Sequence, residues 1–390
     1  MMGIKLSIKF AIGFIKWFLA FCITPHRKDT IERDQIMLIS EKGTDARDNG
    51  YHLFLWIKQH HPDCKVYYVI SKDSPDRSRL DTYSDSIIEY WSFRSCVYFW
   101  KAKYLVSTHQ RAGHTTLPFI LEAWLDRLFH IYKYKKVCFL QHGVIKDFMQ
   151  RLVYEKTHYD LFICGARPEH AYILSAYGYP DSVAKYTGLC RYDNLDIEKP
   201  DRQILVMPTW RMYLNQRNIH NSNYLKAYIS LLQSPQLSAL LERNKVDLVF
   251  YPHHMIQPYL DLFRSNMISS RIKIAAQAHY DVQTLLKRSA LLVTDYSSVY
   301  FDFAYMKKPI VFYQFDYDEY RKGHFQTGWL DYKNSFGPVA YDESQLLTFI
   351  ENYLSKDMNM EQRYVDFVDY CFPIRDKNNC QRVFDAIMHC

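Results

Sequence analysis

The sequence predicts an α/β fold made of two Rossmann-like domains that face a central cleft, preceded by an N-terminal helix that associates with a membrane. Three observations support this prediction. At 390 residues the chain is long enough for two domains of ordinary size. Short apolar runs alternate with helix-like segments, as they do in parallel sheets covered by helices. This alternation stops in a polar stretch near the middle of the chain and then begins again.

The first half contains five apolar runs of strand length, each followed by a polar loop. They are IMLIS, KVYYVIS, KYLVST, KVCFLQHG and DLFICG, at 36–40, 65–71, 103–108, 136–143 and 160–165. Helical segments such as YHLFLWIKQHH separate them. Strands joined in this way are typical of a parallel sheet with helices on both faces.

Residues 190–203 are polar and without periodicity, which predicts the junction between the domains. Five further apolar runs follow it, at 204–209, 247–253, 273–275, 290–295 and 310–315. We therefore predict three parts. They are a membrane-associating helix over 1–30, an N-terminal Rossmann-like domain over 31–195 and a C-terminal one over 196–390. The last helix is a candidate for crossing back to the first domain.

Residues 4–23 are largely apolar but include three lysines. Their uninterrupted apolar runs are shorter than the roughly 20 residues that a spanning helix needs. The segment LAFC, at 19–22, resembles a lipoprotein box, except that Phe21 places a bulky ring where a small residue is required. We therefore expect a helix that lies in or on the cytoplasmic leaflet. A cleaved signal, a true span and a buried N-terminal helix are the alternatives.

The composition is that of a globular protein with a mild basic bias. The net charge is +7, which suits an anionic ligand or an anionic membrane surface. The sequence has no clustered Lys/Arg stripe of the kind that binds nucleic acid, so no nucleic-acid partner is expected. Its nine cysteines are scattered and form no CxxC pair, which favours reduced thiols over a zinc ribbon or a disulfide framework.

The segment LLVTDYSSVYFDFAYMKKPIVFY, 291–313, carries the strongest local signal. A strand should end at Thr294, and the following apolar residues have helical spacing. Ser297 and Ser298 are therefore expected at the turn into a helix, where hydroxyls cap free backbone amides. Those amides and the helix dipole would suit an anion such as a diphosphate. A plain helix cap is the simpler interpretation.

Three other motifs also end predicted strands. His142 precedes a glycine, and Lys146 completes the pattern HGxxK. With an ordinary pKa near 6.5, such a histidine suits a general base, although a structural histidine in a turn is the alternative. MPTWR offers Thr209 and Arg211, and arginine suits bidentate contact with phosphate. YPHH offers His253. Because ligands bind at the carboxyl ends of such strands, the motifs indicate an active site between the two domains.

These motifs, in this order, resemble those of the CDP-glycerol glycerophosphotransferase family, which includes teichoic-acid primases and polymerases and capsule-synthesis transferases. The patterns are HGxxK, PTWR, a histidine after a strand, and TDYSSxxFDFxxxxKPIxFY, and the resemblance covers about 35–385. It implies a GT-B-like fold and a peripheral position on the cytoplasmic face of the bacterial cell membrane. It also implies transfer of glycerol phosphate or ribitol phosphate from a CDP-alditol to a hydroxyl of a lipid-linked glycan or a wall or capsular polymer, with release of CMP.

The resemblance also implies roles for individual residues. His142 and His253 match catalytic histidines. The positions that match donor-binding residues are Thr209, Arg211, Thr294, Asp295, Ser297, Ser298 and Asp302. Tyr251 departs from the family, which usually has Arg or Lys two positions before the second histidine. The sequence also begins without the long N-terminal extension of the polymerases, which favours a primase or a single-addition enzyme.

The remaining expectations concern the acceptor and the metal. Acceptor contacts are expected at strand ends of the first domain, at Asp48, Asn49, His109 and Lys146. No carboxylate cluster suited to holding Mg²⁺ stands out in the sequence, so no metal or other cofactor is expected. Two alternatives remain: a GT-B glycosyltransferase that uses a sugar nucleotide, and a non-catalytic membrane-associated scaffold in polymer assembly.

Overall fold

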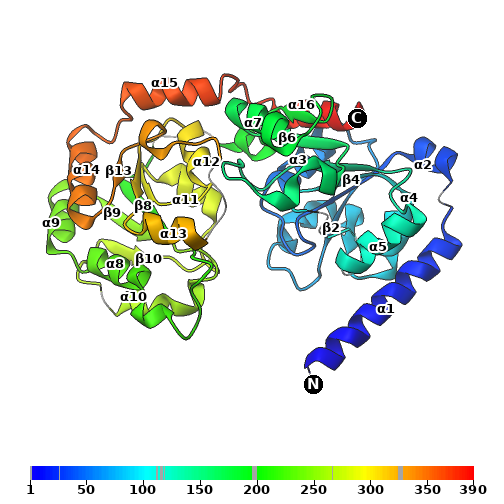
Figure 1. The fold of residues 1–390 in the computed structure, drawn as a ribbon, viewed down its shortest axis with the longest axis horizontal. Helices are drawn as coiled ribbons and strands as arrows, with labels where there is room; N and C mark the ends of the chain where they lie inside the picture. Colours follow the sequence, from blue (N-terminus) through cyan, green and yellow to red (C-terminus); the bar gives the residue numbers. More distant parts are fainter. Residues whose placement is uncertain are drawn as a thin grey trace. The chain divides into compact units, whose positions relative to one another are not determined.

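The computed structural model describes residues 2–390 apart from 26, 111–112, 115–116, 118, 196–199, 266 and 324–327. Part of the predicted junction, 196–199, thus lies outside the described residues. By its internal contacts the chain forms two compact units (Figure 1). Unit 1 comprises Met1–Val144, Gln150–Asp193 and Ile374–Cys390, and unit 2 comprises Ile145–Met149 and Asn194–Pro373.

Unit 1 is built on a seven-stranded sheet in the order β3-β2-β1-β4-β5-β6-β7, in which every neighbouring pair is parallel. The strands are β1 (Ile36–Ser40), β2 (Val66–Ile70), β3 (Ile87–Glu89), β4 (Ala102–Ser107), β5 (Lys136–Phe139), β6 (Leu161–Cys164) and β7 (Ala184–Tyr186). All five predicted runs form strands. The apolar runs did not indicate β3 and β7, each of which has three residues. The order is that of a doubly wound sheet, whose direction of winding reverses between β1 and β4.

Helices cover both faces of this sheet. They are α1 (Met2–Ile23), α2 (Lys28–Asp34), α3 (Asn49–His60), α4 (Phe93–Lys101), α5 (Phe119–Phe129), α6 (Tyr154–Thr157), α7 (Arg167–Tyr177) and α16 (Asn379–Met388). On one face, Leu38 of β1 and Phe99 of α4 share a buried core with Trp17 of α1. Helix α16 packs on α3, where the ring of Phe384 lies 5.7 Å from that of Trp56. The last helix is therefore part of unit 1 by its contacts.

Unit 2 contains a six-stranded parallel sheet in the order β10-β9-β8-β11-β12-β13. The strands are β8 (Gln203–Met207), β9 (Asp247–Phe250), β10 (Ile272–Ile274), β11 (Leu291–Thr294), β12 (Ile310–Tyr313) and β13 (Val339–Ala340). Its helices are α8 (Asn223–Leu232), α9 (Pro235–Asn244), α10 (Leu260–Arg264), α11 (Val282–Arg288), α12 (Tyr300–Tyr305), α13 (Tyr317–Gly323), α14 (Glu343–Ser355) and α15 (Gln362–Cys371). The order 3-2-1-4-5-6 is that of a Rossmann sheet, with its reversal between β8 and β11.

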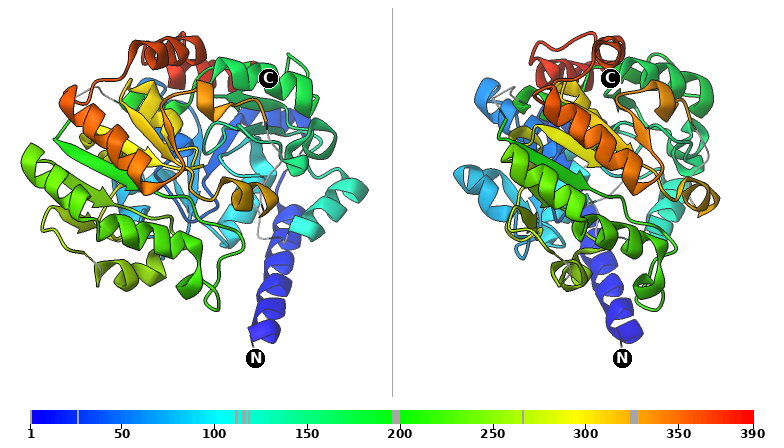
Figure 2. Two further views of the ribbon diagram at one scale, coloured as in Figure 1. Left: turned by 60° about the vertical axis from the view of Figure 1, so that its left-hand side comes forward. Right: turned by 90° about the vertical axis from the view of Figure 1, so that its left-hand side faces the viewer.

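The N-terminal helix packs along one side only. In Figures 1 and 2 the N-terminal half of α1 extends beyond the rest of unit 1. Trp17 and Ala20 are buried, and the ring of Trp17 lies 4.7 Å from that of Trp100 in α4. Phe18 and Leu19, on the other side, are each 50% exposed. Among the described residues, no helix is both long and apolar enough to cross a membrane.

Candidate functional site

His142 lies at the carboxyl end of β5, beside the reversal point of the first sheet. Its side chain is exposed, whereas Gln141 before it is buried and has a φ of +61°. A non-glycine residue in this left-handed region is uncommon and needs support from its surroundings. Here the side-chain amide of Asn49 donates to the Gln141 carbonyl at 2.8 Å, and the Gln141 amide donates to the carbonyl of Ile163. The turn that presents His142 is therefore fixed by buried polar contacts.

Arg191 completes the support of this turn. Its Nη1 donates to the His142 carbonyl at 3.1 Å and to Asp48 Oδ1 at 2.7 Å. The backbone N–H of Arg191 donates to Asn49 Oδ1 at 3.1 Å. Two residues predicted as acceptor contacts thus support the turn. Asn49 binds the Gln141 carbonyl directly, and Asp48 is linked to the His142 carbonyl through Arg191. Sequence reasoning missed Arg191, because it lies in the polar stretch interpreted as a junction.

His109, at the end of β4, stacks on His142. The two rings are 4.7 Å apart and nearly parallel, at 8°. Burial, and then the charge that His142 would carry, lower the pKa of His109 to about 2. Desolvation by the surrounding protein lowers the pKa of His142 as well. The charge of Asp48 raises this pKa, whereas the charges of Arg191 and Lys42 lower it. Both rings are therefore neutral at neutral pH, the state in which His142 can accept a proton.

Glu41 is a buried carboxyl in the loop that follows β1. It accepts hydrogen bonds from the backbone N–H groups of Arg47 at 2.9 Å, Asp48 at 3.1 Å and Tyr51 at 2.8 Å. Burial, and then the charge of Asp48, raise the pKa of Glu41 to about 8, although those hydrogen bonds act to lower it. Glu41 thereby orders the start of α3, from which Asn49 reaches the His142 turn. A lone glutamate after a strand gave no sequence signal for this role.

In unit 2, Arg211 is a fully buried link between three loops. Its Nε and Nη2 donate to Asp316 at 2.7 and 2.9 Å, and its Nη1 lies 2.9 Å from Asp295 Oδ2. The same Nη1 donates to the Thr209 carbonyl at 2.6 Å. The guanidinium has no exposed surface, so its contacts here are those that hold the loops together, and a donor-binding role for Arg211 stays a prediction. Asp316 was not predicted, since nothing local distinguishes it.

Thr294, Asp295 and Asp302 are also buried, and their contact with a donor likewise stays a prediction. Thr294 Oγ1 donates to the Met207 carbonyl at 2.7 Å and joins β11 to β8. Asp295 Oδ1 accepts from the backbone N–H of Thr209 at 2.8 Å. These side chains hold the loops after β8 and β11 together at the reversal point.

The side chains that remain accessible at this point are mostly hydroxyls. Ser297 and Ser298 are half-buried. Thr209 Oγ1, in contrast, is buried and has no hydrogen-bond partner among the described residues. His253, after β9, stacks on Trp210 with their rings 6.3 Å apart and at 15°. Trp210 was part of the PTWR motif, but sequence reasoning gave it no role.

Lys146 belongs to a different unit from the other predicted acceptor residues, Asp48, Asn49 and His109. Its segment, Ile145–Met149, belongs to unit 2 by its contacts. The Lys146 side chain is buried, pairs with Asp147 and lies 5.7 Å from the ring centroid of Tyr332. Asp147 also pairs with Arg321 at 3.0 Å. This environment is a structural ion network. Among the described residues no group of three or more His, Cys, Asp or Glu side chains is arranged to hold a metal ion.

Two doubly wound parallel sheets with polar side chains at their reversal points place this protein among the α/β proteins whose ligands bind at strand ends. The sequence profile of one such family, described as CDP-Glycerol:Poly(glycerophosphate) glycerophosphotransferase, matches residues 20–389. The chain belongs to this family.

Relatives and solved structures agree with that assignment. The minor teichoic acid biosynthesis protein GgaB of Bacillus subtilis (strain 168) is 29% identical over 390 residues, covering 96% of this chain and 42% of GgaB. The teichoic acid poly(glycerol phosphate) polymerase of the same organism is 22% identical over 380 residues, covering 88% of this chain and 47% of the polymerase. The chain thus spans less than half the length of these two relatives. A structure of the wall teichoic acid polymerase TagF shares the fold, with a TM-score of 0.66 at 16% identity over 100% of this chain and 95% of that one.

Proposed function

We propose that this protein transfers glycerol phosphate or ribitol phosphate from a CDP-alditol to a hydroxyl of a lipid-linked glycan or a wall or capsular polymer, and releases CMP. The observation that carries the proposal is His142, presented by a buried polar frame at the end of a sheet in a chain of this family. Unit 1 would serve as the acceptor domain, in the sense that it presents the acceptor hydroxyl to His142, and unit 2 would serve as the donor domain.

In this proposal His142 is the general base. An alcohol is a poor nucleophile at neutral pH, and a base in reach of its proton accelerates the attack. The acceptor oxygen forms a bond to the phosphorus that bears the alditol, and its proton passes to the neutral ring of His142. The bond from that phosphorus to the oxygen shared with CMP breaks, and CMP leaves with the bonding electrons. A lowered pKa keeps His142 unprotonated and ready for this step.

The donor diphosphate would lie at the reversal point of the second sheet. The half-buried side chains of Ser297 and Ser298 supply hydroxyl donors there, and His253 supplies a positive charge when it is protonated. Fixed donors of this kind stabilise the charge that develops as CMP leaves. Arg211 and the buried aspartates act indirectly, by holding the loops that carry these groups.

We also propose that the protein lies peripherally on the cytoplasmic face of the bacterial membrane. The exposed side of α1 carries apolar residues, and α5 adds Trp124 and Phe129, which are 56% and 68% exposed. An apolar cavity of about 580 Å³, lined by both helices, lies between these surfaces. Exposed apolar helix faces of this type insert into the headgroup region of a bilayer, and the net charge of +7 favours anionic lipids.

The proposed function is tested by CMP release from CDP-glycerol and CDP-ribitol in the presence of a membrane extract as acceptor. His142→Ala is expected to lower turnover by a factor of about 10² to 10⁴, the usual contribution of a general base. Binding of CDP-glycerol in calorimetry and the melting temperature should change little. His60→Ala, which removes an exposed histidine of α3, is the matched control.

Three outcomes would contradict parts of this proposal. CMP release by His142→Ala at the wild-type rate would remove His142 from the chemistry. Release of UDP or GDP from a sugar nucleotide, with CDP-alditols inert, would identify a glycosyltransferase. Failure to use any nucleotide donor would favour a scaffold role.

A further inference from the structure

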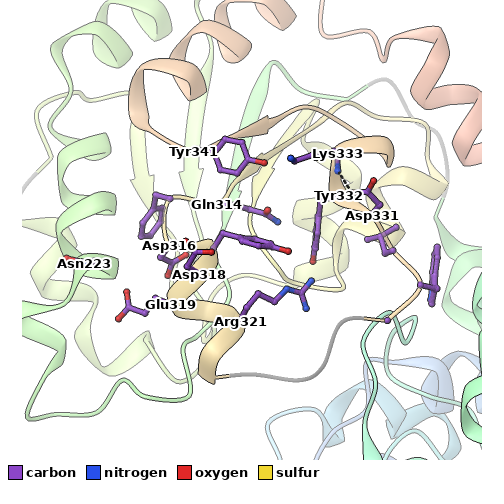
Figure 3. Close-up of a pocket in the computed structure, with 15 residues that line it drawn as sticks. Asn223, Gln314, Asp316, Asp318, Glu319, Arg321, Asp331, Tyr332, Lys333 and Tyr341 are labelled. Atoms are coloured by element: carbon purple, nitrogen blue, oxygen red, sulfur yellow. Dashed lines mark hydrogen bonds between the residues drawn. The ribbon is translucent and has the colours of Figure 1, made fainter.

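Unit 2 contains a cavity of about 870 Å³ at the carboxyl ends of β12 and β13 (Figure 3). Its walls are the turn after β12 with α13, the segment 328–333, Tyr341 after β13, and Asn223 at the start of α8. Small-molecule sites in proteins have volumes of roughly 300–1,000 Å³. None of the predicted donor residues lines this cavity. It is therefore separate from the hydroxyls assigned to the diphosphate.

Aromatic rings form much of the lining. Tyr317 and Tyr341 are 38% and 43% exposed, so part of each ring is accessible to a ligand. Trp329 is half-buried and held in place, because its Nε1 donates to the Ile145 carbonyl at 2.8 Å and its ring packs 5.9 Å from that of Phe301. Rigid aromatic rings offer large apolar surfaces at little cost in conformational entropy, which suits the apolar faces of sugar rings.

The charges at the cavity are mainly negative. Asp318, Glu319 and Asp331 are exposed carboxylates in the lining, whereas Arg321 is already paired with Asp147 at 3.0 Å. Lys333 is the remaining cation of the lining. Carboxylates accept hydrogen bonds from hydroxyl and ammonium groups but repel phosphate. The lining therefore disfavours a diphosphate or a chain of phosphodiesters and suits a polyhydroxylated ligand that is neutral or cationic.

We propose that this cavity binds a non-phosphorylated sugar unit, neutral or amino-substituted, of the acceptor glycan. Calling this glycan the acceptor rests on the proposed function. The binding itself does not, because it depends only on the cavity. The aromatic rings would contact the ring faces of the sugar, and the carboxylates of Asp318 and Glu319 would accept hydrogen bonds from its hydroxyl or ammonium groups.

Calorimetry on the full chain, without donor, tests this binding with N,N′-diacetylchitobiose, de-N-acetylated chitobiose, CMP and glycerol 1-phosphate as probes. At least one of the two disaccharides is expected to bind. Tyr341→Ala should weaken that binding about fivefold to tenfold, through loss of one aromatic contact. Tyr370→Ala removes an exposed tyrosine of α15 outside the cavity and should leave it unchanged.

The double variant Asp318→Asn with Glu319→Gln tests the role of charge. It should weaken binding of the cationic disaccharide more than binding of the acetylated one, since the amides keep hydrogen bonding but lose the charge. Asp357→Asn, at an exposed carboxylate outside the lining, is the control.

The proposal is overturned if neither disaccharide binds, or if Tyr341→Ala and the double variant leave their binding unchanged. It is also overturned if CMP or glycerol 1-phosphate binds and Tyr341→Ala abolishes that binding, because the cavity would then be an anion or nucleotide site. Turnover is measured separately. If CMP release is absent while sugar binding is intact, the proposed function is contradicted and the sugar site is still supported.

Discussion

At the residue scale, the position of His142 depends on backbone geometry that the sequence does not display. Glycine tolerates positive φ, so Gly143 would be the ordinary residue for such a conformation in this turn. In the structure Gln141 has the positive φ instead. Asn49 and Arg191, far away in the chain, stabilise it. The histidine could therefore be predicted from its motif, but its supporting residues could not, since only the folded sheet brings them together.

The charge of Asp48 provides a test of the base. The charge of Asp48 raises the pKa of His142, whereas desolvation lowers it. Removing this charge in Asp48→Asn should therefore lower the pKa of His142 further. A base is active when deprotonated. The acid limb of the pH profile of kcat/KM should therefore lie below the ordinary histidine value of about 6.5 in the wild type, and at still lower pH in Asp48→Asn. A limb that moves to higher pH, or stays in place, would contradict this assignment.

Glu41 should make the stability of the protein depend on pH. Its pKa is about 8 when folded and about 4.3 when unfolded. The folded state then retains a proton that the unfolded state loses, so stability falls as pH rises from about 4.3 to about 8. In thermal unfolding, Glu41→Gln should lose less stability than the wild type over this range. Glu155→Gln, at an exposed glutamate of α6, should follow the wild type. Parallel curves for Glu41→Gln and the wild type would show that Glu41 is ionised in the folded state.

At the scale of elements, α12 differs from the expectation in its cap. Ser297 and Ser298 precede the helix, as expected, but its N-cap is Val299, which makes no side-chain cap, and the helix covers only Tyr300–Tyr305. Ser297 Oγ accepts from the Val299 N–H at 3.4 Å. A helix of six residues has a weak macrodipole, because it aligns the dipoles of only a few peptide units. Anion binding by this segment would therefore depend on the serine hydroxyls and not on the helix dipole.

The one-sided packing of α1 leads to a prediction about membranes. Replacing exposed Phe18 and Leu19 by Glu should reduce cosedimentation with vesicles of phosphatidylglycerol, because charged side chains oppose insertion into the headgroup region. Ile268→Glu places the same change on an exposed apolar residue of unit 2 and is the control. Equal binding by the α1 variant and the wild type would mean that α1 does not mediate membrane association.

At the scale of the whole molecule, the pattern of apolar runs predicted both parallel sheets, because buried parallel strands are nearly continuous apolar segments. It did not reveal the short strands β3, β7 and β13. Nor did it reveal that Ile145–Met149, only three residues after His142, belongs to unit 2. A short segment carries no periodic signal of its own, and its partners Gly328 and Trp329 lie far away in the sequence.

The discontinuity of unit 1 affects how the protein can be synthesised. Its segment Ile374–Cys390 leaves the ribosome after the residues of unit 2. Until then Asp193 lacks Asn379 and Cys380, whose backbone N–H groups donate to its carboxylate at 2.9 and 2.7 Å. Unit 2 needs only the chain up to Pro373. In the nascent chain the second unit can therefore complete its fold before the first, the reverse of the usual N-terminal-first order of domain folding.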